Sequence, residues 1–187
     1  MGHGGDVIQE LTTDHREVEE IFSRIETLPS GAEQRKDLAD QATIELVRHS
    51  VAEEMHLYPA VRQYLANGDA LADKEIEDHA KAEQIMKDLE GCKPGEPDFE
   101  RLVTALISEV RDHIEDEELI LFTQLRQAAG AEELQKLGDK VRTAKKTAPT
   151  RPHPSAPDTP PGNKLLAPGA GLVDRVRDLF SGRGTDG

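Results

Sequence analysis

The sequence predicts an all-α protein, an antiparallel up-down four-helix bundle with an internal two-fold repeat, a short fifth helix and a Pro-rich C-terminal tail. Three observations support this prediction. Apolar residues recur at intervals of three and four, and no stretch alternates with the period of a strand. Segments rich in glycine and proline divide the first 130 residues into four such stretches. The polar residues of the first two stretches recur in the last two at one fixed offset.

Capping residues mark the start of the first two predicted helices. Asp6 is a suitable N-cap, and Gln9, three residues later, is placed to complete a capping box. Ser30 and Glu33 show the same pattern before the second helix. The segment "LPSG" at 28–31 separates the two helices, because proline and glycine favour turns.

Proline and glycine also bound the later helices. "NGD" at 67–69 ends the second helix, and a third helix covers about 71–90. The fourth begins near Pro97, a favourable first-turn residue, and ends around Gly130. Apolar residues at helical spacing predict an additional helix at 131–147.

The composition changes after about residue 147. The stretch "TAPTRPHPSAPDTPPGN" is rich in proline, which predicts an extended and unpacked linker. The following "GLVDRVRDLF" has one apolar stripe, which predicts a short tail helix at 171–180 that either docks on the bundle or binds a partner protein. The predicted domains are thus a four-helix bundle at 1–130, an additional helix at 131–147, and a Pro-rich linker with a short amphipathic tail helix at 148–187.

The overall composition argues against several kinds of partner. The chain has 187 residues, 32% of them charged, and a formal net charge of -14. This acidity disfavours nucleic acid and anionic membranes, and no stretch approaches the length of a membrane span. The single cysteine, Cys92, cannot close a disulfide within the chain, and the N-terminus does not resemble a secretory signal. We therefore expect a cytoplasmic protein.

An internal repeat relates the two halves of the predicted bundle. "DHREVEEIFSRIE" at 14–26 matches "DHAKAEQIMKDLE" at 78–90, and "HSVAEEMHLYPAVRQ" at 49–63 matches "HIEDEELILFTQLRQ" at 113–127. Both pairs are offset by 64 residues, the difference between 14 and 78 and between 49 and 113. Each half is thus a helical hairpin with a histidine on its first helix and His-x-x-x-Glu on its second. The six repeated residues are His15, His49, Glu53, His79, His113 and Glu117.

These six polar residues occupy positions where a bundle should be apolar. On the second helix, the apolar seam through Leu38, Ala42 and Leu46 continues to His49 and Glu53, and the fourth helix has the same register. Burying unpaired carboxylates costs on the order of several kcal/mol each. Bound cations would remove this cost, so the pattern predicts a metal site in the bundle core.

The donor set indicates which metals the site suits. Imidazole and carboxylate without thiolate suit iron, zinc, copper or nickel. Glutamates from facing helices are placed to bridge two metal ions, with two histidines left for each. Two irons would then keep room for an oxo or hydroxo bridge and for open positions that meet a small molecule. Zinc or manganese in place of an iron is compatible with the same donors.

This set of residues resembles the hemerythrin-like, or HHE cation-binding, domain family over roughly residues 6–130. The resemblance implies a non-haem di-iron centre in a four-helix bundle, with reactivity toward dioxygen, peroxide or nitric oxide, or a sensing role. The oxygen-carrying hemerythrins have five histidines and a final His-x-x-x-x-Asp, whereas here Glu83 follows His79 by four and the last motif ends in Glu117. More carboxylate character favours ferric iron and redox chemistry over reversible oxygen carriage.

Two further residues are candidates for an extra ligand or for a hydrogen-bond partner of a ligand. His56 follows Glu53 by three, and its counterpart in the second half is Ile120. Tyr58 lies off the ideal seam, so its phenol is either near the metal or packed in the core, and Pro59 is a plausible source of helix distortion.

The other polar neighbours have weaker assignments. Asp14 and Asp78 are candidates to hold ligand histidines in place. We expect the remaining acidic residues near the motifs to be solvated, capping or at the surface, and the two histidines of the terminus and linker to have no specific role. These residues are Glu19, Glu83, Glu54, Glu118, His3 and His153.

Three functions are compatible with this sequence. A di-iron oxidoreductase would turn over O2, H2O2 or NO as a peroxidase-, catalase- or nitric-oxide-reactive enzyme. A non-catalytic sensor or sequestering protein would bind iron, oxygen or nitric oxide and report through the tail at 171–180. A purely structural bundle would need no metal at all, and the six aligned polar residues disfavour it strongly.

Overall fold

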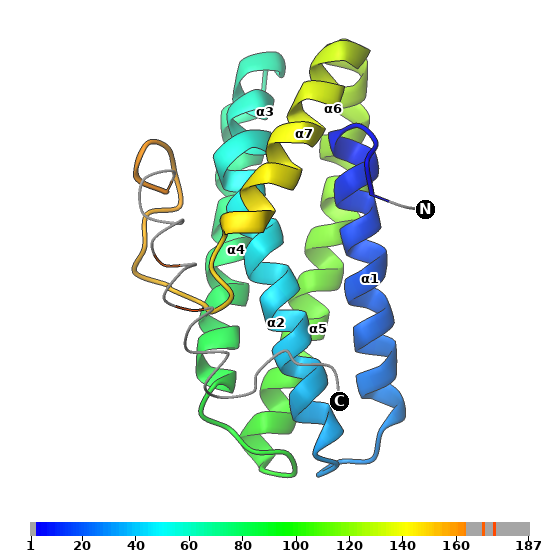
Figure 1. Ribbon diagram of the computed structural model, residues 1–187, viewed down its shortest axis with the longest axis vertical. Coiled ribbons are helices and arrows are strands. Elements are labelled where there is room, and N and C mark those ends of the chain that lie inside the picture. The colour runs from blue at the N-terminus through cyan, green and yellow to red at the C-terminus, as the bar shows by residue number, and fades with distance from the viewer. Residues whose placement is uncertain (1–2, 164–169, 171–173, 175–187) are drawn as a thin grey trace.

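The computed structural model describes residues 3–163, 170 and 174, and in these residues it contains helices and no strand. The predicted all-α four-helix bundle is confirmed, with its long helices running up and down side by side (Figure 1). None of the described helices is long and apolar enough to span a membrane. The α-helices are α1 (Val7–Thr27), α2 (Gln34–Ala52), α3 (Tyr58–Tyr64), α4 (Gly68–Leu89), α5 (Pro97–Asp116), α6 (Phe122–Ala128) and α7 (Ala131–Thr147).

One of the two predicted capping boxes is present. The Gln9 N–H donates to Asp6 Oδ1 at 2.9 Å, and the Asp6 N–H donates to Gln9 Oε1 at 3.1 Å, so α1 begins as predicted. The box predicted at Ser30 and Glu33 is wrong. The Ser30 hydroxyl donates to Glu100 Oε1 at 3.0 Å in the second hairpin, and α2 starts without a side-chain cap.

A π-helical turn interrupts the second helix of each hairpin. The turns η1 (Glu53–Leu57) and η2 (Glu117–Leu121) join α2 to α3 and α5 to α6. In each, an N–H reaches back five residues, from Tyr58 to the Glu53 carbonyl and from Phe122 to the Glu117 carbonyl. Both halves have the turn although Pro59 has no proline counterpart at Thr123, so the proline is not its cause.

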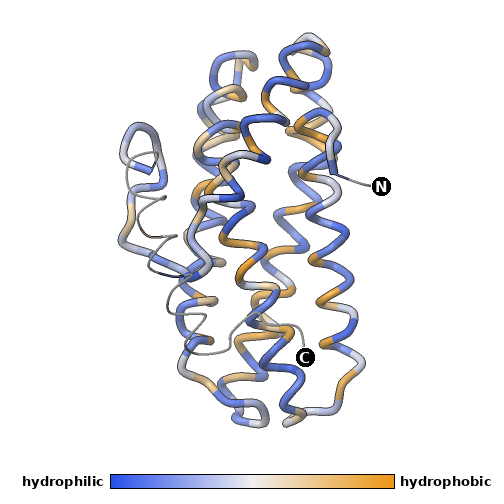
Figure 2. The backbone as a smooth tube through the Cα atoms, in the orientation of Figure 1, coloured by the Kyte–Doolittle hydropathy of each residue, from blue (hydrophilic) through white to orange (hydrophobic). Residues whose placement is uncertain are grey.

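The bundle interior consists of two apolar clusters. One lies where α3, α6 and α7 meet the start of α1, with Leu57 and Leu121 at its centre, both fully buried. The other fills the opposite end, around Phe22, Phe99 and Leu106. Figure 2 shows the hydrophobic residues recurring along every helix, as the sequence pattern predicts. Aliphatic packing therefore holds both ends of the bundle together.

The fifth helix, α7, lies diagonally across α1 and α2 (Figure 1). It is anchored by Glu10, a carboxylate on α1 that is only 2% exposed. Glu10 accepts hydrogen bonds from the Gly4 N–H at 3.1 Å, from Arg142 at 3.2 Å and from Lys145 at 3.3 Å. These bonds tie the N-terminus, α1 and α7 into one unit.

The proline-rich segment after α7 is packed against the bundle, so the prediction of an unpacked linker is wrong for the described part. Thr150 and Asn163 are 2% and 3% exposed. The His153 N–H donates to Glu83 Oε1 on α4 at 2.7 Å. Within the segment, the Ala156 and Asn163 N–H groups donate to the carbonyls of His153 and Thr159, while the His153 N–H reaches the neighbouring helix. The tail helix predicted at 171–180 lies outside the described residues except for residue 174.

Glu10→Gln is expected to lower the free energy of unfolding at neutral pH by about 1.5–3 kcal/mol, the usual contribution of hydrogen bonds to a charged group. Burial alone would raise the pKa of Glu10, but the Gly4 N–H, Lys145 and Arg142 outweigh it and lower the pKa. The stabilisation is therefore present above the unfolded-state pKa and is lost as the pH falls through the lower folded-state pKa. Thermal unfolding of the wild type and of Glu10→Gln, measured from neutral pH down through the folded-state pKa of Glu10, checks this prediction. A difference in Tm that does not change with pH would contradict it.

Candidate metal centre

Four imidazole rings meet at mid-height in the bundle, one from each of α1, α2, α4 and α5. All four residues are at most 8% exposed. The Nε2 atoms of His15 and His49 lie 3.3 Å apart, and those of His79 and His113 also lie 3.3 Å apart. Each hairpin therefore contributes one pair of histidines.

Two glutamates lie between the histidine pairs, each at the first residue of a π-turn. Glu53 Oε2 is 3.1 Å from His49 Nε2 and 3.3 Å from His79 Nε2. Glu117 Oε2 is 3.5 Å from His15 Nε2 and 3.7 Å from His113 Nε2. Each carboxylate thus approaches one histidine of each pair, which is the arrangement that a bridging ligand requires.

The burial of these glutamates fits a cation between them. Both side chains are 0% exposed, and among the described residues Glu53 Oε1 and Glu117 Oε2 have no hydrogen-bond partner. A buried carboxylate oxygen without a partner is costly unless a cation binds it. The structure groups His15, His49, Glu53 and Glu117 around one point, and Glu53, His79 and His113 around another. The nitrogen and oxygen donors of both groups suit iron, manganese or zinc.

A second ring of carboxylates surrounds the histidines. Each of the four accepts a hydrogen bond from a histidine Nδ1, which holds the ring in place and leaves the Nε2 lone pair aimed at the centre. The pairs are His15 with Glu118 at 2.9 Å, His49 with Asp14 at 3.1 Å, His79 with Glu54 at 3.0 Å and His113 with Glu75 at 2.8 Å.

The sequence reasoning misjudged three of these four carboxylates. Glu54 and Glu118 were expected at the surface, yet both point inward to a histidine. Their common offset of 64 residues was the signal that could have found them. Asp78 was expected to hold a histidine as Asp14 does, but it pairs with lysines on α4, and Glu75 takes its place. Glu75 has no counterpart in the first half, so the repeat could not reveal it.

The structure brings Tyr58 into the centre. Its hydroxyl oxygen lies 3.0 Å from His79 Nε2, 3.2 Å from Glu117 Oε1 and 3.5 Å from Glu53 Oε2. His56 is half-buried, and it belongs to none of the metal-capable groups found in the described part of the chain. The π-turn explains why Tyr58 and not His56 lies at the centre. Its extra residue turns Tyr58 toward the helix face that carries Glu53.

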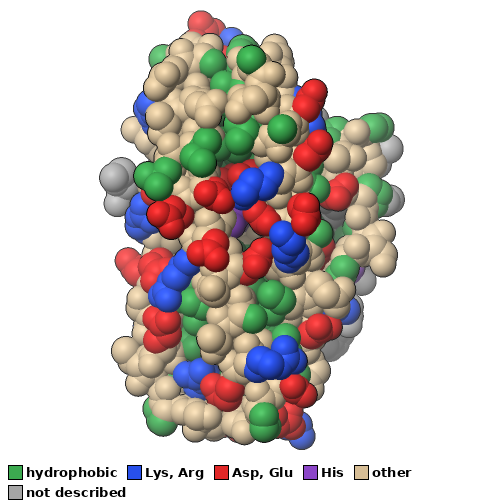
Figure 3. Space-filling model, turned by 180° about the vertical axis from the view of Figure 1, so that it is seen from behind, with side chains coloured by type: hydrophobic (Ala, Val, Ile, Leu, Met, Phe, Trp, Pro, Cys, Tyr) green, Lys and Arg blue, Asp and Glu red, His purple; other side chains and the backbone are tan. Residues whose placement is uncertain are grey.

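The carboxylates give the centre a field that favours positive charge. Burial alone would lower the pKa of His49, but Glu53 and Asp14 outweigh it and raise the pKa to about 10. Burial also opposes protonation of His79, whose pKa Glu53 and Glu54 raise to about 10. Figure 3 shows red and blue side chains crowded at mid-height on the rear face, around a purple histidine. Metal ions would replace these protons as the positive charge.

Comparison with known proteins decides the family. Residues 6–125 match the model of the hemerythrin HHE cation-binding domain. The chain belongs to this family. An HHE domain is a cation-binding domain, and the buried histidine and glutamate groups at the centre of this bundle could hold a metal ion.

Two relatives and one solved structure resemble this HHE protein. An uncharacterised hemerythrin-like protein of Schizosaccharomyces pombe is 28% identical over 168 residues, 89% of this chain and 82% of that protein. A protein of Nostoc sp. named DNA nickase is 25% identical over 135 residues, 72% of this chain but only 38% of its own length. A crystal structure of a hemerythrin HHE cation-binding domain-containing protein of Mycobacterium kansasii has the same fold, with a TM-score of 0.65 and 21% identity over 75% of this chain and 85% of that one.

Glu75→Gln is expected to weaken metal binding roughly 10- to 100-fold, the usual cost of removing a carboxylate that orients a ligand histidine. The matched control is Asp78→Asn on the same helix, which should change affinity less than about fivefold because it removes only near-surface ion pairs. Competitive titration of each metal-free protein against a chelator measures both affinities. A larger loss of metal affinity in Asp78→Asn than in Glu75→Gln would contradict the role of Glu75 as the partner of His113.

Proposed function

We propose that the chain is a non-haem di-iron protein that reacts with dioxygen, peroxide or nitric oxide. One observation carries the proposal: two buried histidine pairs are joined by two buried glutamates that each approach both pairs. A purely structural bundle would be more stable with apolar residues in this layer, because burying charge is costly. We propose His15 and His49 as ligands of one iron, His79 and His113 as ligands of the other, and Glu53 and Glu117 as the bridges between them.

Bound iron would supply redox chemistry and open coordination positions for a small molecule. The protein supplies the rest. The carboxylates at the Nδ1 atoms hold the four rings in one orientation, and the apolar clusters at both ends of the bundle exclude water. Tyr58 holds a proton on its hydroxyl oxygen 3.2 Å from Glu117 Oε1, where it can donate a hydrogen bond to a molecule bound at the centre.

A non-catalytic sensor or sequestering protein for iron, oxygen or nitric oxide is the second candidate. The observation that favours it is the docked tail. His153 bonds to Glu83 on α4, one helical turn from His79, so a change at the centre lies close to a segment that could transmit it to a partner. Turnover separates the two candidates, because a sensor reacts once and an enzyme repeatedly.

The decisive experiment measures the metal content and visible spectrum of the purified protein, followed by repeated addition of peroxide. We expect about two irons per chain, a ferric absorption band and continued peroxide consumption. Two irons that change colour once and then stop reacting would support the sensor instead. A stable, fully folded protein that takes up no metal would contradict both.

His113→Ala and Glu117→Ala are expected to reduce metal content and to lose metal-linked stability, about 2.7 kcal/mol at free metal a hundredfold above Kd. Glu19→Gln is the matched control, because Glu19 also follows a ligand histidine by four but pairs with Arg111 instead. Elemental analysis and thermal unfolding with and without metal measure both effects. Wild-type metal content in both alanine variants would refute the ligand assignment.

Tyr58→Phe is expected to keep both metal ions but to change the absorption spectrum and the reaction rate with peroxide, since only the central hydroxyl is removed. His56→Ala, two residues earlier and within the π-turn, should leave the spectrum and the rate unchanged. If His56→Ala has the larger effect, the placement of these two residues relative to the metals is wrong.

A further inference from the structure

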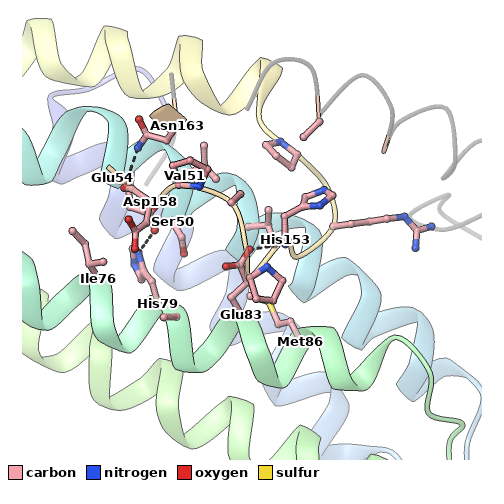
Figure 4. Close-up of a pocket in the computed structure, with 18 residues that line it drawn as sticks. Ser50, Val51, Glu54, Ile76, His79, Glu83, Met86, His153, Asp158 and Asn163 are labelled. Atoms are coloured by element: carbon pink, nitrogen blue, oxygen red, sulfur yellow. Dashed lines mark hydrogen bonds and ion pairs between the residues drawn. The ribbon is translucent and has the colours of Figure 1, made fainter. Parts of the chain in front are cut away.

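The four carboxylates around the histidines differ in what lies beyond them. Three of them form a further ion pair with a basic side chain. For Glu54, which holds His79, the described residues provide no lysine or arginine partner, and Glu83 and Asp158 lie nearby instead (Figure 4). The three pairs are Asp14 with Lys145, Glu118 with Arg16, and Glu75 with Lys74.

The internal repeat shows how the corresponding carboxylate and histidine are covered in the other half of the bundle. In the groove between α1 and α5, Arg16 pairs with Glu118 over the bond to His15. One turn away, Arg111 bonds to Glu19 at 2.6 and 3.0 Å. Two arginines thus cover this side of the centre with charge-assisted hydrogen bonds.

The equivalent groove between α2 and α4 lacks both arginines. The offset of 64 residues places Ala80 at the position of Arg16 and Val47 at that of Arg111. Neither side chain can pair with the carboxylates of this groove, so the helices alone leave His79 and its partner uncovered. A different part of the chain covers them.

That cover is the proline-rich segment 149–163, which lies along α2 and α4. Besides the bond from His153 to Glu83, Arg151 pairs at 3.2 Å with Glu90, the residue that caps the C-terminus of α4. Figure 4 shows His153, Asp158 and Asn163 on one side of the pocket, and Glu54, His79 and Glu83 on the helices opposite. The segment thus forms one wall of a pocket and α2 and α4 form the other.

A buried carboxylate fastens this cover. Asp174, which is 0% exposed, accepts hydrogen bonds from the backbone N–H groups of Thr150 and Arg151 at 3.2 and 3.1 Å. The His153 Nε2 lies 2.9 Å from the same oxygen. Three contacts to one carboxylate hold residues 150–153 in the shape that spans the groove.

The cavity behind the cover is small and borders the centre at one residue, His79. It measures about 90 Å³, room for a few water molecules or a small ligand, and Glu54 and His79 form part of its wall. Most of the wall is apolar, from valine, isoleucine, methionine and proline side chains. The wall contains three carboxylates, Glu54, Glu83 and Asp158, and one arginine, Arg151. Because Arg151 is paired with Glu90, the three carboxylates dominate the charge of the wall and repel anions. The chemistry therefore suits a small uncharged molecule.

We infer that this tail-covered pocket binds a small uncharged molecule, of the kind of nitric oxide, dioxygen or hydrogen peroxide, and conducts it to the His79 side of the centre. The inference deepens the proposed function and rests on it for the destination of the ligand. The pocket itself does not depend on which metal is bound.

Xenon, a small neutral atom, tests the pocket without any reaction. Crystals of the full chain under xenon pressure should show xenon between α2, α4 and residues 149–163. Ala80→Arg places at Ala80 the kind of side chain that Arg16 provides in the other groove, and it should remove the xenon. Ala70→Arg, an exposed position on α4 outside the pocket, is the control for the added charge and should keep it.

Nitric oxide tests whether a molecule reaches the centre through this pocket. Its binding to the iron-loaded protein, followed by stopped-flow absorption, should slow about tenfold in Ala80→Arg, equivalent to a barrier higher by roughly 1.4 kcal/mol. Asp174→Ala should instead speed nitric oxide binding, because it removes the hydrogen bonds that hold residues 150–153 over the groove. Azide, a small anion, should bind far more slowly than nitric oxide in the wild type.

The outcomes separate the pocket from the proposed function. Xenon in the wild type but not in Ala80→Arg, with the matching change in nitric oxide rate, supports the inference. Xenon that is absent from the wild-type pocket overturns it, as does a nitric oxide rate that neither Ala80→Arg nor Asp174→Ala alters. A wild-type protein that takes up xenon here but reacts with none of nitric oxide, dioxygen and peroxide supports the binding pocket and contradicts the proposed function.

Discussion

The rest of the structure depends on one constraint, a layer of buried charge across the middle of an otherwise aliphatic bundle. Four histidines and six carboxylates meet there between two apolar clusters. Aliphatic packing alone would hold the helices at almost any register, but this layer requires one register on all four. Lysine and arginine side chains pair with three of the six carboxylates, and the other three, Glu53, Glu54 and Glu117, need positive charge from protons or from metal ions.

The two π-turns determine which side chains beyond the glutamates face the buried layer. Each begins at one of the two central glutamates, Glu53 or Glu117, and inserts one residue into the helix, so that the next turn presents a different side chain to the centre. In the first half this brings in the hydroxyl of Tyr58, and in the second half Phe122 stacks on His15 at a centroid distance of 5.8 Å. One polar and one apolar residue at equivalent positions make the two sides of a symmetric scaffold chemically different.

The sequence predicted the scaffold well because both of its signals are periodic. Helical spacing identified the helices, and the 64-residue offset identified the six central residues, which the structure brings together. Two kinds of feature could not be predicted from these signals. A π-turn leaves no trace in hydrophobic periodicity, so an ideal helix could not decide between Tyr58 and His56 as the residue at the centre. Glu75 and the docked tail obey no repeat, and their contacts join residues far apart in the chain, such as Glu75 with His113 and Glu83 with His153.

Anomalous X-ray diffraction at the iron edge, from a crystal of the iron-loaded protein, tests the central claim most directly. The account predicts two peaks inside the bundle, one beside the Nε2 atoms of His15 and His49 and one beside those of His79 and His113. A competing acidic group, His3 with Glu10 and Asp14, lies near the N-terminus, where Lys145 already pairs with both carboxylates. Peaks at that group, or none in the bundle core, would contradict the account.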